Sequence, residues 1–64
     1  IQRNGNEVIL QSDALLSLTV FDCIGQRVVT TQSNKPFYLS KGLYFLALTD
    51  AASIPYTIKY WQEN

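Results

Sequence analysis

The chain has 64 residues and a mass of 7.3 kDa, and its five basic and five acidic side chains give no net charge. This length allows one small domain, and no apolar run approaches the roughly 20 residues that span a bilayer. Zero net charge offers no electrostatic basis for binding nucleic acid, and one Cys without any His excludes an internal disulfide framework and the usual zinc sites. The chain begins with Ile1 and not Met, so we expect a domain excised from a longer protein.

Apolar and polar residues alternate with a period of two along most of the chain, which is typical of β-strands buried on one face. The period of 3.6 that marks a helix hardly occurs, so the sequence predicts an all-β domain. Six short strands are expected, at residues 7–11, 15–21, 27–31, 37–39, 42–49 and 53–61.

The strand at residues 42–49 is apolar on both faces, which is typical of a central strand covered on each side. Elsewhere the alternation separates a core face from a solvent face. The side chains expected in the core are Leu16, Leu18, Val20, Val28, Leu39, Tyr44, Leu46, Leu48 and Ile58.

Two features of the connections support this reading. Residues 22–25 begin with Asp22 and end with Gly25, and this order predicts a type I turn that is closed by a glycine at positive φ. Pro55 has no backbone N–H to donate, so the last strand is expected to lie at a sheet edge or to turn that site toward solvent.

Catalytic chemistry is poorly represented. The acidic residues are scattered, and Cys23 has only Arg27 as a cationic neighbour across the turn, so we interpret it as an exposed thiol at a hairpin tip. The tyrosines and Trp61 could form a platform that stacks on sugars, but aromatic side chains in a small sandwich usually fill the core. Trp61 is the aromatic residue best placed for exposure. We expect no cofactor, no metal and no small-molecule substrate.

Three segments, taken in order, carry a recognisable pattern. The first is an alternating strand followed by Asp22-x-x-Gly25 and Arg27, the second is Gly42-x-Tyr44 at the start of an apolar strand, and the third is Thr57-x-Lys59 near the end of the sequence. Their order and spacing, over about residues 8–60, resemble the C-terminal sorting domain of cargo proteins of the type IX (Por) secretion system of Bacteroidetes.

The resemblance implies an immunoglobulin-like antiparallel β-sandwich that lacks its first strand here. It implies a non-catalytic signal that directs a larger protein from the periplasm through an outer-membrane translocon to the cell surface or the medium. There a sortase-like protease would remove the domain or the cargo would be anchored. The residues that it marks for partner recognition are Asp22, Gly25, Arg27, Gly42, Tyr44, Thr57 and Lys59.

Two other classes of function stay open. An immunoglobulin-like structural or adhesion module of a surface protein has the same alternation, and a carbohydrate-binding version of it would need two or three coplanar exposed aromatic rings. An enzyme is the third and least supported class. The parent reading frame would discriminate them: a signal peptide at its start and a stop codon soon after Asn64 favour sorting, and a further domain downstream favours the structural module.

Overall fold

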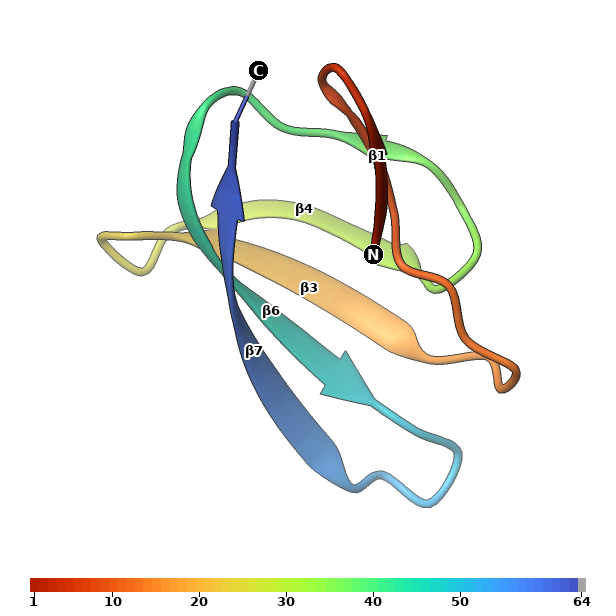
Figure 1. The fold of residues 1–64 in the computed structure, drawn as a ribbon. Helices are drawn as coiled ribbons and strands as arrows, with labels where there is room; N and C mark the ends of the chain where they lie inside the picture. Colours follow the sequence, from red (N-terminus) through yellow and green to blue (C-terminus); the bar gives the residue numbers. More distant parts are fainter. Residues whose placement is uncertain (64) are drawn as a thin grey trace.

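The computed structural model describes residues 1–63 and contains seven β-strands in two antiparallel sheets (Figure 1). The smaller sheet has the strand order β1-β2-β5, and the larger sheet has the order β4-β3-β6-β7. Their bounds are β1 Gln2–Asn4, β2 Glu7–Ile9, β3 Ser17–Asp22, β4 Arg27–Gln32, β5 Phe37–Tyr38, β6 Gly42–Thr49 and β7 Pro55–Gln62.

The core lies between the two sheets. The larger sheet supplies alternate residues of β3 and β6, and the smaller sheet closes over them with residues in or next to β2 and β5 (Figure 1). The buried apolar side chains are Val8, Leu10, Leu18, Val20, Phe37, Leu39, Tyr44, Leu46 and Leu48. This two-layer arrangement lets each sheet bury one face, which is the usual way in which an antiparallel sheet acquires a core.

The predicted all-β fold is confirmed, and each of the six expected strands has a counterpart. The prediction missed β1, because Gln2, Arg3 and Asn4 are polar and exposed and give no apolar alternation. Backbone pairing with β2 holds this strand, with Gln2 opposite Ile9 and Asn4 opposite Glu7.

The predicted core is confirmed at six positions, and Leu16 is half-buried against it. Two assignments are wrong: Val28 is 46% exposed and Ile58 is 39% exposed. At Val28 the cause is a bulge, because Phe21 pairs with Arg27 whereas Val20 pairs with Val29, so that Val28 is the extra residue and Val29 packs on the core in its place.

Ile58 has a different cause. It lies directly opposite the fully buried Leu46, on the same face of the larger sheet. However, β7 is the edge strand of that sheet, and the smaller sheet does not cover its first half. Tyr56 and Ile58 are therefore exposed, while Tyr60 is half-buried and Gln62 is fully buried further along the strand.

Two buried polar side chains, Ser33 and Gln62, have no signal in the sequence, and each forms hydrogen bonds to a connecting segment. The Ser33 hydroxyl accepts a hydrogen bond from the backbone N–H of Leu16 (2.9 Å) and donates to the carbonyl of Ala14 (3.2 Å). Gln62 donates from Nε2 to the carbonyl of Gly5 (2.8 Å), and its Oε1 accepts from the Tyr60 hydroxyl. Hydrogen bonds of this kind offset the cost of burying polar groups, and the Gln62 bond ties the end of β7 to the β1–β2 turn.

Strand β6 is internal in its sheet, as expected, but the prediction that both of its faces are covered is wrong. Leu46 and its alternate neighbours face the smaller sheet, whereas Leu43, Phe45 and Ala47 are half-buried on the opposite, outer face. No strand of the described residues packs on that outer face. The larger sheet therefore presents apolar side chains outward.

Candidate functional site

The β3–β4 turn has the predicted geometry. Gly25 adopts a φ of 87°, and its N–H donates to the carbonyl of Asp22 (3.0 Å). The Asp22 carboxylate accepts hydrogen bonds from the backbone N–H groups of Ile24 (3.1 Å) and Gln26 (2.9 Å). Asp22 and Gly25 thus have a structural role that is sufficient to explain them, since a side-chain acceptor and a residue free to take positive φ build this turn.

Arg27 leaves the turn as the first residue of β4 and is exposed. It pairs with Phe21, which pairs with Phe45 on β6, which in turn pairs with Lys59 on β7. These four residues form one row across all four strands of the larger sheet, with two aromatic rings between two cations. We call this the cationic–aromatic row.

Side chains next to the row extend its apolar part. Leu43 and Trp61 form the neighbouring pair on β6 and β7, and Trp61 is 50% exposed, as the sequence analysis expected. On the other side, Thr57 lies in the next outer row, opposite Ala47. Direct cross-strand neighbours have Cβ atoms about 5 Å apart, so this part of the sheet forms one continuous surface.

Gly42 and Tyr44 lie at the start of β6 and differ from the cations in burial. Tyr44 is only 7% exposed, and its hydroxyl donates to the carbonyl of Ser40 (2.9 Å) and lies 3.2 Å from the Ser40 hydroxyl. Tyr44 also pairs with Asp22 on one side and with Tyr60 on the other, on the core face of the sheet. Its side chain is therefore a core element, and a partner could not contact it without disturbing the fold.

Six of the seven residues marked by the resemblance, with Gly42 at the start of β6 among them, lie on strands of the larger sheet and divide between its faces, and Gly25 lies in the β3–β4 turn. Arg27, Thr57 and Lys59 share the outer face, Tyr44 belongs to the core, and Asp22 and Gly25 form the turn at one end. Sequence reasoning did not select Phe21 and Phe45. The signal for Phe45 is the second apolar face of residues 42–49, which the sequence analysis assigns to burial beneath another layer, and Phe21 is identified only by its pairing with Phe45.

The β7 strand lies at the edge of its sheet, and this confirms the expectation drawn from Pro55. The backbone N–H of Asp50 donates to the carbonyl of Ile54 (3.4 Å), so Asp50 and Ile54 are a hydrogen-bonded pair of the β6–β7 hairpin. Since bonded and non-bonded pairs alternate in an antiparallel ladder, the backbone groups of Tyr56, Ile58 and Tyr60 point to β6. The backbone groups of Thr57, Lys59 and Trp61 point to the open edge. Pro55 also faces this edge, so its lack of an N–H leaves no bond to β6 unmade.

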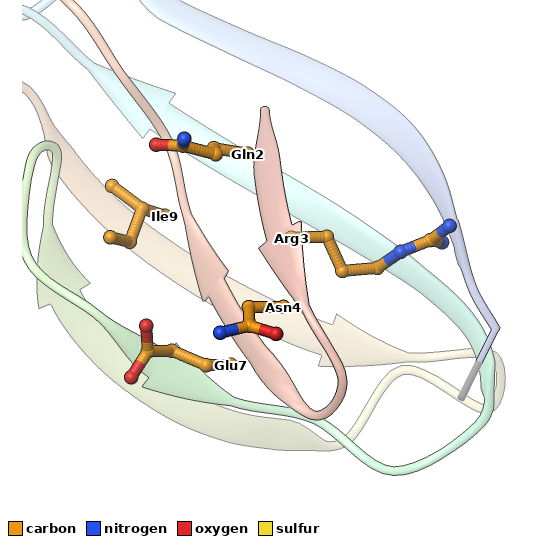
Figure 2. A pocket seen from close by; sticks show the side chains of 5 residues that line it. All are labelled: Gln2, Arg3, Asn4, Glu7 and Ile9. Atoms are coloured by element: carbon orange, nitrogen blue, oxygen red, sulfur yellow. The ribbon is translucent and has the colours of Figure 1, made fainter.

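A second surface feature is a shallow hollow of about 380 Å³ on the β1–β2 hairpin. Figure 2 shows Gln2, Asn4, Glu7 and Ile9 gathered along the hairpin, while Arg3 extends away from them. The lining side chains are half-buried or exposed, and none is a buried polar group aimed into the hollow. The hollow thus lacks the enclosure and fixed polar groups that small-molecule sites have.

Other chemistry is sparse within residues 1–63. Cys23 is a free, exposed thiol at the tip of the β3–β4 turn, as expected. No group of three or more His, Cys, Asp or Glu side chains in this part of the chain is arranged to hold a metal ion. The described strands and loops include no helix long and apolar enough to cross a membrane.

Comparisons of the chain with protein-family models, with curated proteins and with solved structures found no match.

Proposed function

We propose that this domain is a non-catalytic sorting signal of the type IX kind, which protein partners read on the surface of the larger sheet. The observation that carries the proposal is that the three motifs, which are separated in sequence, lie on adjoining strands of one sheet. The Asp22–Gly25 turn leads into Arg27 on β4, Gly42 opens β6, and Thr57 and Lys59 lie on β7. Such a displayed surface with an open strand edge is sufficient for recognition by protein.

In this proposal the motif residues have two kinds of role. Asp22, Gly25 and Tyr44 hold the sheet in shape, while Arg27, Thr57 and Lys59 are exposed and provide the contacts. The partners are an outer-membrane translocon and a surface protease of the sortase-like kind. The domain passes through the periplasm and reaches the cell surface or the medium.

The test is export of a periplasmic reporter fused in front of residues 1–64, in a bacterium with a working type IX system. The fusion also includes, before residue 1, the opening segment of a known sorting domain. The reporter is expected at the cell surface or in the medium. Deleting residues 56–64 should leave it in the periplasm, but this deletion also removes the buried Gln62 and thus the fold.

Point variants separate recognition from folding. The double variant Arg27→Glu/Lys59→Glu reverses both exposed charges of the cationic–aromatic row, and we expect it to reduce export at least about tenfold, since charge reversal at an interface costs several kcal/mol. The matched control is Lys35→Glu/Lys41→Glu, which reverses two exposed cations in the loops before and after β5. Retention of the unaltered fusion in the periplasm, while a known sorting domain exports the same reporter, would refute the proposal.

The cationic–aromatic row favours a second candidate, an adhesion module that binds an acidic polysaccharide. Phe21 and Phe45 lie side by side between Arg27 and Lys59, and Trp61 is half exposed beside them. Aromatic faces stack on sugar rings, and the flanking cations suit carboxylate groups. Titration with polygalacturonate, with neutral dextran as the control, tests this function. Binding that is lost on Trp61→Ala, in a protein that exports nothing, would replace the sorting proposal.

A further inference from the structure

We propose that the domain self-associates through the open edges of β7, with two copies joined about a two-fold axis at Ile58 into one continuous antiparallel sheet. The inference does not depend on the sorting function. It rests on the exposure along β7, on the direction of its backbone groups and on the position of its only charge.

Four of the nine large exposed hydrophobic side chains within residues 1–63 lie on this strand and its turn. Ile54, Tyr56 and Trp61 are about half exposed, at 51%, 51% and 50%, and Ile58 is 39% exposed. By contrast, the other edge of the larger sheet, β4, carries only Val28 among the large exposed hydrophobic residues. A long edge strand with exposed apolar side chains is a template for pairing with another strand.

The alternation of the hairpin decides which residues can pair. The backbone groups of Thr57, Lys59 and Trp61 point outward, so a second strand must place its own outward-pointing residues opposite them. A two-fold axis at Ile58 meets this requirement. It places Thr57 opposite Lys59 of the second copy and Pro55 opposite Trp61 of the second copy.

The same axis places Ile58 opposite Ile58 of the second copy, in a pair whose own backbone bonds go to β6. Side chains of such pairs approach most closely, with Cα atoms about 4.5 Å apart. Tyr56 then lies opposite Tyr60 of the second copy. Tyr56 and Ile58, which the smaller sheet leaves uncovered, thereby gain apolar cross-strand neighbours in both copies.

Lys59 selects this register among the neighbouring ones. An axis at Lys59 would place two lysines opposite each other, which is unfavourable. An axis at Thr57 or at Tyr60 avoids that contact but shortens the paired segment. The axis at Ile58 pairs the strand from Pro55 to Trp61 without opposing like charges. Lysine and proline on an edge strand oppose promiscuous pairing, and here the Ile58 axis gives the longest register that opposes no lysines.

The interface consists of one strand edge and its flanking side chains. The area that it buries is smaller than the ~800 Å² per partner of a stable complex. Association is therefore expected to be weak, and sedimentation equilibrium at protein concentrations up to about 1 mM measures it. Cys23 is replaced by Ser throughout, so that disulfide formation at the exposed turn does not contribute.

Charge swapping at the axis tests the register. Ile58→Lys and Ile58→Glu should each associate at least about tenfold more weakly than the parent, because each variant places two like charges opposite each other at the axis. An equimolar mixture of the two should associate again. Val28→Lys on β4, a matched change at an exposed edge valine, should associate like the parent. Circular dichroism checks that each variant is folded.

Oxidative cross-linking gives a second readout. Ile58→Cys should form a covalent dimer readily, whereas Thr57→Cys should not, because Thr57 of one copy lies opposite Lys59 of the other. A parent that is monomeric at 1 mM would overturn the proposal. So would equal cross-linking at both positions, or loss of association in Val28→Lys but not in the Ile58 variants.

Discussion

The hairpins β3–β4 and β6–β7 have turns with the same hydrogen bonds and different residues at the position that needs positive φ. In each turn an Asp carboxylate accepts from the backbone N–H groups two and four residues later: Asp22 from Ile24 and Gln26, and Asp50 from Ala52 (2.9 Å) and Ile54 (3.0 Å). The fourth residue is Gly25 at a φ of 87° in one turn, and Ser53 at 63° in the other.

The strands that follow these turns also differ. After Gly25, the bulge at Val28 shifts the register of β4, so that the side chain of Val29 packs against the core. After Ser53 the ladder with β6 is regular, yet the first half of β7 is exposed. The comparison teaches that turn chemistry fixes the hairpin, whereas burial depends on the sheet that lies opposite. The predictions below separate these two contributions to stability.

The largest effect is expected where two directly paired residues differ in burial. Leu46→Ala should lower the free energy of unfolding by ~2–5 kcal/mol, because Leu46 is fully buried. Ile58→Ala, at the residue opposite, should cost less than about 1 kcal/mol, because the side chain already contacts solvent. Urea unfolding followed by circular dichroism measures both. Equal losses would mean that both halves of β7 are covered.

The next largest effect concerns the glycine of the first turn. Gly25→Val forces a β-branched residue to a φ near 87° and should destabilise the domain by ~1–3 kcal/mol. An added Cβ meets no atom within 4 Å, so the cost arises from the backbone and not from a clash. The matched control is Ile24→Val, one residue earlier on the exposed tip, which should melt like the parent.

Removing the carboxylate acceptors should have similar effects in both turns. Asp22→Ala and Asp50→Ala each lose two backbone-to-carboxylate hydrogen bonds, and each should cost ~1–2 kcal/mol. Asp→Asn at either position keeps an acceptor oxygen and should restore part of that loss. A large difference between the thermal melts of the two alanine variants would show that the same hydrogen bonds contribute unequally to stability in the two turns.

The smallest effect is a gain in stability. Ser53 already has a φ of 63°, so Ser53→Gly should stabilise the domain by ~0.5–1 kcal/mol by removing the strain of a side chain in the left-handed region. The measurement is the shift of the urea midpoint relative to the parent. A loss of stability would mean that the Ser53 side chain contributes more to the turn than its backbone strain costs.

The sequence was sufficient for the fold class, for the Asp22–Gly25 turn and for the edge position of the last strand, because alternation, turn chemistry and the missing N–H of Pro55 are local properties. It was not sufficient at Val28 or Ile58. A bulge is decided by the pairing of two strands, and exposure at an edge is decided by the width of the facing sheet.

The candidate site was only partly accessible from sequence for the same reason. The motif residues could be selected, but their division between the core and the outer face depends on register. The row that joins Arg27, Phe21, Phe45 and Lys59 combines residues from four strands. No spacing within one strand indicates it.

The hydrogen bond from Gln62 to the carbonyl of Gly5 joins residues that are 57 positions apart. Closing a loop of that length costs about 3–4 kcal/mol of chain entropy, and the contact repays little of this until the sandwich has formed. The first hairpin should therefore dock late in refolding, after β6 and β7 have paired, on the millisecond-to-second scale of folds rich in non-local contacts. During synthesis, the β1–β2 hairpin could therefore dock in its native position only after Gln62, near the end of the domain, had been added to the chain.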